Sequence, residues 1–455
     1  MFLVDMNQGR IIKDEEVKSE VTSKYPYQKW VKDNILPLSK IPYTGNKTPA
    51  EEIDFETRLR IFGYTQEDFK TVILPMCVNA KEAIGSMGSD TPLAVLSNKP
   101  QLLYNYFKQL FAQVTNPPLD GIREEIVTDT SLAVGSDFNI FNINEKHAKK
   151  LKINNPIISN EDLDKIKFVK HKDFKSFTIP ALYDLNKGHN GIEQSLEKIV
   201  NEIEKKVDND YNIIILTDRN VSKKKAPIPM LLACSTVHHY LIKKKKRSKF
   251  GIIIESAEPR EPHHFSMLFG YGASAINPYL VNEIITYHHK KGIISGITRN
   301  KSIANYNKAI AKGILKVMNK IGISTLHSYR GSQIFEALGL RKKFVDKYFN
   351  NTPSRIEGVG LYVLEKEISE RLNTAFNSEL DISKLEMGGE YRWRRNGEKH
   401  MLNPTTISKL QQAVRSEKYE TYKEYSVQIN KQNEQLMTIR GLFKFVELDL
   451  SLIHI

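Results

Sequence analysis

Charged side chains gather directly after three stretches of the sequence that are expected to be buried strands. The residues concerned are Asp218, Arg219, Glu255, Glu258, Arg260, His327 and Arg330. In parallel α/β folds, ligands and catalytic groups collect at the carboxyl ends of the strands. The pattern therefore predicts one of two things. These residues form either a ligand or catalytic site, or an ion-paired network that closes the rim of the sheet or docks another domain.

Two pairs of adjacent histidines, His238 with His239 and His263 with His264, follow neighbouring predicted strands. Imidazole is a common zinc ligand. Adjacent side chains point in different directions on a helix, however, so one pair cannot chelate a metal in the way that an i, i+4 pair can. A metal site would need the two pairs to converge. Hydrogen-bonded structural histidines are the preferred interpretation.

Residues 270–275, Gly-Tyr-Gly-Ala-Ser-Ala, come near the dinucleotide-binding fingerprint, whose glycines admit a pyrophosphate to a helix N-terminus. The fingerprint follows a strand directly, whereas here a helical segment over 263–269 comes first. We therefore predict a tight turn that leads into a strand, in preference to a cofactor site.

The sequence contains only two cysteines, Cys77 and Cys234. Two thiols far apart in the sequence exclude a disulfide scaffold. They also exclude, for this chain alone, a cysteine-ligated zinc ion or iron–sulfur cluster. Cys234 lies in an apolar helical run over 230–237, where a buried structural thiol is expected.

An alternation of strands and helices from residue 153 onward must position these groups. Residues 211–216 and 250–254 are apolar runs typical of strands buried in a parallel sheet. Helices are predicted over 191–207, 229–242, 265–269, 280–289 and 302–318, and a further strand over 323–328. The alternation indicates βα units with a mainly parallel sheet.

The flanking segments carry weaker patterns. Residues 14–23 predict a polar helix, residues 25–49 a proline-punctuated linker, and residues 102–111 an aromatic-rich amphipathic helix. Towards the end of the chain, a loop or short hairpin over 387–397 precedes two polar helices over 404–415 and 418–432.

Composition narrows the class of protein. A chain of 455 residues should form two or three domains. No window approaches the roughly 20 apolar residues of a membrane helix, and the N-terminus lacks the layout of a signal peptide. We therefore expect a cytoplasmic protein without a membrane partner.

The net charge of +14 resides partly in basic runs that no aromatics interrupt, so solvated lysines are expected rather than a nucleic-acid site. A basic nucleic-acid-binding protein is the less favoured alternative.

Several segments resemble one family in a single register. They include Glu-Ser-Ala-Glu-Pro-Arg-Glu-Pro-His-His at 255–264, His-Ser-Tyr-Arg-Gly-Ser-Gln-Ile-Phe-Glu at 327–336, and stretches at 84–88, 109–118, 217–219, 237–239, 352–355, 388–391 and 436–443. On these residues the chain resembles the large (alpha) chain of glutamate synthase, above all its central domain.

This resemblance implies an enzyme that makes two glutamates from glutamine, 2-oxoglutarate and two electrons. In that family an amidotransferase domain releases ammonia with an N-terminal cysteine. A tunnel delivers the ammonia to an FMN-bearing (βα)8 barrel with a 3Fe–4S cluster. The central domain lies between these sites and is related in fold to a degenerate barrel.

By the same resemblance, residues 1–30 are the tail of an amidotransferase domain with its linker, and residues 31–386 are the central domain. Residues 387–455 are the truncated start of an FMN-type (βα)8 barrel domain. The last ten residues or so read as an artefact of the gene model.

The resemblance implies that this segment binds neither FMN nor the cluster and is inactive alone. It would space the two active sites and help to form the ammonia tunnel, at Thr115 and Asn116. The expected partners are the remainder of the same polypeptide and, for the whole enzyme, a small NAD(P)H-oxidising subunit or ferredoxin. The alternative is a self-standing scaffold that binds separately encoded amidotransferase and synthase subunits.

Overall fold

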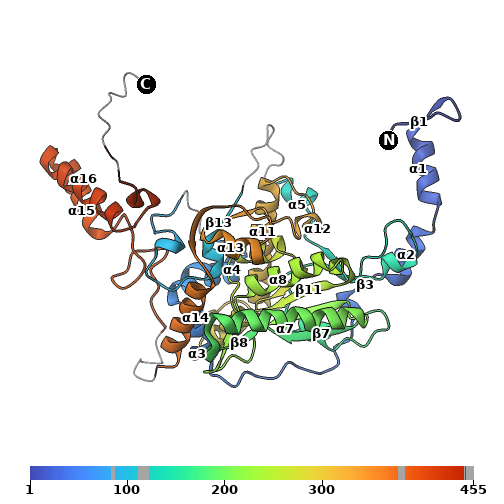
Figure 1. The fold of residues 1–455 in the computed structure, drawn as a ribbon, viewed down its shortest axis with the longest axis horizontal. Coiled ribbons are helices and arrows are strands. Elements are labelled where there is room, and N and C mark those ends of the chain that lie inside the picture. The colour runs from blue at the N-terminus through green and yellow to red at the C-terminus, as the bar shows by residue number, and fades with distance from the viewer. Residues whose placement is uncertain (84–87, 111–121, 378–384, 445, 447–455) are drawn as a thin grey trace.

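The computed structural model describes residues 1–83, 88–110, 122–377, 385–444 and 446. A central α/β body carries an extension at each end (Figure 1). The first comprises β1 (Leu3–Asp5), β2 (Arg10–Ile12), α1 (Asp14–Ser23) and α2 (Tyr27–Asn34). The second is an antiparallel-looking pair of helices, α15 (Pro404–Ser416) and α16 (Tyr419–Glu434), on the opposite side of the body.

A parallel four-stranded sheet forms the centre of the body. Its order is β12 (Ala275–Asn277), β11 (Gly251–Glu255), β9 (Ile213–Thr217) and β7 (Ser176–Pro180). Every residue of β9 and β11 is buried, as apolar runs in a parallel sheet require. The predicted α/β class with a mainly parallel sheet is therefore confirmed.

Helices link and cover these strands. They are α6 (Asn160–Lys167), α7 (Gly188–Asp208), α8 (Met230–Lys243), α9 (Pro262–Gly270), α10 (Tyr279–Lys290) and α11 (Arg299–Lys320). Ile192, Leu196, Ile199 and Ile203 form the buried stripe of α7, with the spacing of one helical face. The five helices predicted after residue 190 are confirmed to within a few residues at each end.

Both faces of the central sheet are buried. Ile214, Leu216 and Ile252 belong to the main hydrophobic core. Ile215 and Ile253 point the other way, into a smaller core shared with β5 (Leu132–Val134), β6 (Leu151–Ile153) and α6. Because successive side chains alternate between faces, the continuous isoleucine runs satisfy both cores at once.

The remaining elements form smaller sheets and short helices. Three strands pair in the order β14 (Ser354–Val359), β13 (Phe335–Leu340), β4 (Phe107–Gln109), and three in the order β3 (Leu36–Pro37), β6, β5, while β10 (Lys225–Pro227) pairs with β8 (Leu182–Asp184). The other helices are α3 (Phe55–Ile61), α4 (Leu74–Asn79), α5 (Glu124–Val127), α12 (Leu326–Tyr329), α13 (Lys342–Tyr348) and α14 (Leu361–Ala375), with a π-helical turn, η2, at Asp68–Ile73. No sheet in the described part of the chain closes into a barrel, so a relation to a degenerate barrel stays a prediction.

The helix predicted over 102–111 is wrong for the residues that the structure describes. Residues 103–106 form a short 3-10 turn, and Phe107–Gln109 form β4, which pairs antiparallel with β13. Tyr104, Tyr106 and Phe107 are buried. Aromatic residues favour strands where cross-strand partners are available, and the partner here lies more than 200 positions away.

Two other predictions are also corrected. The second half of the expected strand over 323–328 is instead the start of the helical turn α12, which the Thr325 side chain caps. The expected linker over 25–49 contains α2 and β3, and β3 pairs in parallel with β6. In both cases, the contacts that determine the structure of the segment are made with residues distant in the sequence.

Candidate functional site

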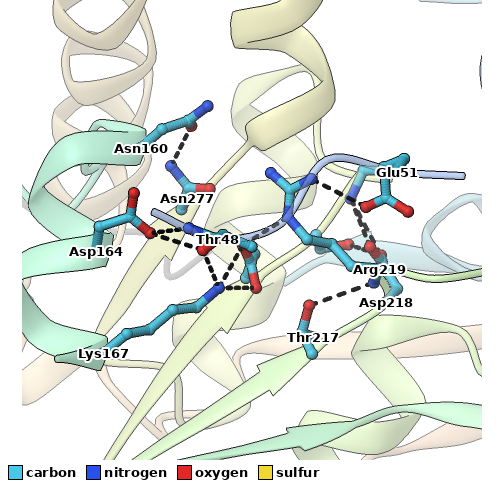
Figure 2. A network of polar contacts seen from close by, with 12 residues as sticks. Thr48, Glu51, Asn160, Asp164, Lys167, Thr217, Asp218, Arg219 and Asn277 are labelled. Atoms are coloured by element: carbon cyan, nitrogen blue, oxygen red, sulfur yellow. Dashed lines mark hydrogen bonds and ion pairs between the residues drawn. The ribbon is translucent and has the colours of Figure 1, made fainter. Parts of the chain in front are cut away.

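Glu255 ends β11 and lies at the centre of a buried ion-pair network. Its side chain is only 1% exposed. Lys167 Nζ lies 2.8 and 2.7 Å from its two carboxylate oxygens, and Arg219 Nε lies 2.7 Å from Oε1. Figure 2 shows Lys167 reaching in from α6 and Arg219 reaching in from the residues after β9. The carboxyl ends of neighbouring strands therefore do bring together some of the charged groups that the sequence indicated.

The segment at residues 48–51, which precedes α3, covers this network. Glu51 Oε1 accepts a hydrogen bond from Arg219 Nη1 at 2.9 Å, and Thr48 Oγ1 accepts one from Lys167 Nζ at 2.8 Å. The Thr48 hydroxyl also donates to Asp164 at 2.6 Å (Figure 2). Residues 48–51 thus close over the strand ends. Sequence reasoning missed them because no local pattern links them to residues more than 100 positions away.

Charge compensation dominates the electrostatics of the network. Burial acts to raise the pKa of Glu255, but the positive charges of Arg219 and Lys167 outweigh it and hold the pKa below its usual value. The Arg219 guanidinium also lies 3.8 Å from the centre of the Tyr279 ring. Each charged group is therefore balanced inside the protein.

Asp218 and Glu258 are buried beside this network in a different state. Asp218 accepts hydrogen bonds from Ser256 Oγ at 2.5 Å and from the Ala257 N–H at 3.1 Å. Glu258 accepts one from the Met230 N–H at 2.9 Å, at the start of α8. Burial raises the pKa of both carboxyl groups. Their hydrogen bonds connect the strand ends to the following loop and helix.

Arg260 points away from the network, towards the end of α3. Its guanidinium donates to the carbonyl oxygens of Phe62 at 2.7 Å and Gly63 at 2.9 Å, and lies 3.2 Å from Asp68. These carbonyls follow the last turn of α3, where helix carbonyls lack intrahelical partners. Arg260 therefore joins the sheet to the α3–η2 unit.

His327 and Arg330 lie elsewhere. Arg330 Nη1 donates to Ser274 Oγ at 3.0 Å. Ser274 immediately precedes β12, so this contact lies at the amino end of the sheet. His327 is exposed on α12. The structure thus brings together two of the three predicted clusters and separates the third, because α12 replaces the expected strand. Thr115 and Asn116 lie outside the described residues.

The histidine pairs do not converge on one point. Each of the four rings has a hydrogen-bond partner within the chain; for His238, His239, His263 and His264 these are Arg247, Gln333, the Tyr104 carbonyl and the Arg260 N–H. Burial lowers the pKa of His238 to about 2 and of His263 to about 4. Within the described ranges no group of three potential ligands could hold a metal ion. The hydrogen bonds support the interpretation as structural histidines.

Side chains fill the space beside the glycines of residues 270–275. A Cβ on Gly270 would lie 2.7 Å from Phe335 Cε2, and one on Gly272 would lie 2.3 Å from His238 Nδ1. Gly272 also has a φ of +109°. Residues 270–274 turn directly into β12, so the predicted tight turn is confirmed. These glycines accommodate neighbouring side chains and leave no cradle for a pyrophosphate.

Cys234 is completely buried in α8, as expected. Burial raises the pKa of its thiol to about 12, which makes it unreactive at neutral pH. Cys77 is buried as well.

A second cluster, unforeseen from the sequence, joins residues 387–403 to the core. Glu67 accepts hydrogen bonds from four successive backbone N–H groups, those of residues 389–392, at 2.8, 2.8, 3.2 and 3.0 Å. Such a run of converging N–H groups is an anion-binding concavity. Here an internal carboxylate occupies it. The only local signal is the Gly388-Gly389 pair, whose positive φ angles let the N–H groups converge.

Two further contacts strengthen this junction. The Tyr391 hydroxyl donates to Glu261 at 2.9 Å. The His400 ring bridges Asp90 through Nδ1 and the Gly389 carbonyl through Nε2, both at 2.9 Å. Residues 387–403 are therefore held on the core by several independent anchors.

No helix in the described part of the chain has the length and apolar content to cross a bilayer.

Comparisons with known proteins agree on one family. Residues 57–341 match the model of the glutamate synthase central domain, and residues 1–30 match class-II glutamine amidotransferases. The chain is 40% identical over 446 residues to the NADPH glutamate synthase large chain of Bacillus subtilis, covering 98% of this chain and 29% of that one.

Other relatives give the same result. The NADH glutamate synthase of Schizosaccharomyces pombe is 36% identical, covering 98% of this chain and 22% of that one. The ferredoxin-dependent enzyme of Cyanidium caldarium is 37% identical, covering 98% and 29%. The chain thus spans less than a third of the length of these relatives. A flavocytochrome b2 variant aligns with a TM-score of only 0.30 at 10% identity, over 70% of this chain and 90% of that one, and does not bear on the fold. On the family match, the chain belongs to the glutamate synthases, with residues 57–341 as its glutamate synthase central domain.

Proposed function

We propose that this chain works as part of a glutamate synthase, where it separates the amidotransferase site from the FMN site and helps to line the ammonia tunnel. The observation that carries the proposal is the match to glutamate synthase large chains over 98% of the chain. The match of residues 1–30 to class-II glutamine amidotransferases supports an amidotransferase domain in the same polypeptide. We further propose a cytoplasmic location.

The geometry at the strand ends supports a spacing role over a catalytic one. Arg219 and Lys167 are satisfied by Glu255, Glu51 and Thr48, all within the chain. A substrate at this position would have to displace the 48–51 segment and leave buried charges without partners, at a cost of several kcal/mol. The network therefore suits a closed structural rim.

The iron–sulfur cluster implied by the family does not fit the residues of this chain. A 3Fe–4S cluster needs three cysteine thiolates, whereas the sequence has two cysteines, both buried. The near-fingerprint at 270–275 is filled by Phe335 and His238. We therefore assign no chemical step to this chain and propose that it is inactive alone. Relatives carry NADPH, NADH and ferredoxin in their names, and we propose that a small NAD(P)H-oxidising subunit or ferredoxin supplies the electrons.

For the tunnel, the proposal rests on Thr115 and Asn116. Short polar side chains suit a path for neutral ammonia. They can form hydrogen bonds with it but do not bind it as tightly as an ion would be bound. The junction at residues 387–403 supports a rigid connection between the central domain and the segment that follows it.

A chimeric enzyme tests the proposal. Residues 57–341 would replace the matching part of the Bacillus subtilis large chain, and glutamate formation would be measured with glutamine or with added ammonium as the nitrogen source. We expect activity with both. Replacing Thr115 and Asn116 by tryptophan should abolish activity with glutamine and leave activity with ammonium.

The controls separate the alternatives. Tryptophan at two exposed positions within residues 57–341, Lys198 and Lys301, should leave both activities unchanged. Equal loss of both activities in the Thr115 and Asn116 variant would contradict a tunnel role. Stable capture of separately expressed amidotransferase and synthase domains by the 455-residue chain would favour the self-standing scaffold instead.

A further inference from the structure

Residues 387–403, called the junction segment below, form part of the wall of a cavity of about 520 Å³. The junction segment lines the cavity with residues such as Gly389, Tyr391 and Glu398. The other lining residues belong to the body and include residues of α9, of α14 and of the turn after α3. How firmly the junction segment is held therefore decides how closed this cavity is.

His400 holds the junction segment from a buried position. Its side chain is 5% exposed. Nδ1 lies 2.9 Å from Asp90 Oδ1, and Nε2 lies 2.9 Å from the carbonyl oxygen of Gly389. Asp90 belongs to the body, 310 positions before His400 in the sequence. The ring therefore connects the end of the junction segment both to its beginning and to the body.

Both partners of the ring are hydrogen-bond acceptors. A carbonyl oxygen and an ionised carboxylate can only accept. Burial acts to raise the pKa of Asp90, but hydrogen bonds from the Leu402 N–H and from the His400 ring outweigh it and hold the pKa below its usual value. Asp90 is therefore ionised at neutral pH. Both nitrogens of the ring must then carry a hydrogen, and only the imidazolium form has one on each.

A neutral ring cannot satisfy this arrangement. Whichever nitrogen lost its hydrogen would turn a lone pair towards an oxygen of Asp90 or of Gly389, so that two acceptors would face each other. An unmatched contact of this kind inside a protein is unfavourable. Loss of the proton should therefore release one of the two contacts.

Other charged groups lie around the ring. Glu67 of the body accepts the N–H of Gly389, the residue whose carbonyl oxygen faces His400. Two further groups of the body contact the junction segment, Lys99 at Asn396 and Glu261 at Tyr391. The remaining charged residues of the segment itself are Glu390, Arg392, Arg394, Arg395, Glu398 and Lys399.

One of these groups titrates in the same range as histidine. Desolvation, followed by the charges of Glu261 and Asp68, raises the pKa of Glu390 to about 7. A test of His400 must therefore separate its titration from that of Glu390.

We propose that His400 is a pH-dependent switch that fastens the junction segment as the imidazolium and loosens this wall of the cavity when it loses a proton. Histidine changes its charge between about pH 5 and 8. The segment should therefore be held firmly at the acidic end of this range and should open more often at the alkaline end. The inference uses none of the groups of the strand-end network and does not depend on the function proposed above.

Hydrogen exchange of the 455-residue chain at about pH 6 and about pH 8.5 tests this inference, because exchange reports local opening. The results are compared as protection factors, which remove the pH dependence of the intrinsic exchange rate. The reporting amides are those of Met401 and Leu402, which donate to the carbonyl oxygen and to Oδ2 of Asp90. We expect their protection to fall at least tenfold at the higher pH. The amides of residues 389–392, which donate to Glu67, should lose less protection.

Asp90→Asn is the most informative variant. The asparagine oxygen can still accept the Leu402 N–H, while its NH2 group can donate to a neutral Nδ1. The neutral ring then satisfies both partners, since Nε2 keeps its hydrogen for the Gly389 carbonyl. The loss of protection at about pH 8.5 should disappear in this variant. His400→Gln should also remove the pH dependence, with low protection at both pH values.

Two controls separate His400 from other titrating groups. Glu390→Gln removes the carboxyl group that titrates in the same range, and the fall in protection at Met401 and Leu402 should remain. His171→Gln removes an exposed histidine elsewhere in the chain and should also leave the fall unchanged.

Three results would overturn the proposal. One is equal protection of Met401 and Leu402 at the two pH values in the unaltered chain, a measurement that needs no variant to fold. Another is a fall in folded Asp90→Asn or His400→Gln as large as that of the unaltered chain. The third is disappearance of the fall in Glu390→Gln, which would assign the pH dependence to Glu390.

Discussion

The Glu67 carboxylate accepts a hydrogen bond from the backbone N–H of Gly389 at 2.8 Å, although 322 positions separate the two residues. The three N–H groups that follow point at the same carboxylate. One side chain of the central domain thus orders the start of the next segment. The position depends on Gly388, since a Cβ there would lie 2.6 Å from Glu67 Cβ.

Glu67→Gln should loosen residues 387–403. The amide NH2 group cannot accept hydrogen bonds, so part of the N–H cradle loses its partner, at about 1–3 kcal/mol for the buried donors. Hydrogen exchange should become faster at residues 389–392. Glu386→Gln, a substitution of an exposed neighbour, is the matched control. Unchanged exchange in Glu67→Gln would contradict the role of this carboxylate.

Glu255→Gln should strongly destabilise the fold. It leaves Lys167 and Arg219 with less negative charge in a buried site, and breaking a buried ion pair in this way costs about 3–5 kcal/mol. Urea unfolding measures the loss. Glu161→Gln removes an exposed partner of Lys165 on α6 and should change stability by less than about 1 kcal/mol. Similar values for both variants would argue against the network as a structural rim.

Gly272→Ala should destabilise the fold through both sterics and backbone strain. The new methyl group would meet the His238 ring, and the positive φ is unfavourable for alanine. Together these effects should cost about 2–4 kcal/mol. Gly292→Ala is the control, since Gly292 has a positive φ of +71° but no atom within 4 Å of the added methyl. Thermal unfolding should show a clearly larger drop for Gly272→Ala.

Glu367 should make the protein less stable as the pH rises. Burial is the main cause that raises the pKa of this carboxyl group to about 7, although the Tyr106 hydroxyl donates to it at 2.8 Å. An unfolded chain releases this proton near pH 4.5, so the folded state is penalised increasingly from about pH 4.5 to 7, and the penalty is constant above that.

Glu367→Gln tests this dependence. The glutamine oxygen can still accept from Tyr106, so the variant should raise the melting temperature at pH 8 and change it little at pH 5. Glu370→Gln, at an exposed position on the same helix, should leave the pH profile unchanged. A stabilisation of Glu367→Gln that is the same at both pH values would contradict the assignment.

The central sheet could be predicted from the sequence because its signal is local. The isoleucine runs of β9 and β11 need burial on both faces, and the helices between them carry clear apolar stripes. The fold of residues 102–110 could not be predicted in this way. A short aromatic run suits a helix or a strand, and the presence of β13 as a partner decides the outcome.

The candidate site was predicted in part for the same reason. Asp218 follows β9 and Glu255 ends β11, and because these two strands are adjacent and parallel, their carboxyl ends bring the two residues together. The sequence did not indicate Thr48, Glu51 or Glu67. Their contacts are with residues far away in the sequence, and such contacts produce no periodic pattern of residue types. His327 was misplaced because α12 was interpreted as a strand.

The rim formed by residues 48–51 bears on how the domain can be divided. The region that matches the central-domain model begins at residue 57, yet Arg219 and Lys167, deep inside that region, take partners from Glu51 and Thr48. A shortened protein that begins at residue 57 would lack Thr48 and Glu51, and would leave Lys167 and Arg219 without these partners. The smallest autonomous folding unit should therefore start before Thr48, upstream of the boundary that similarity marks.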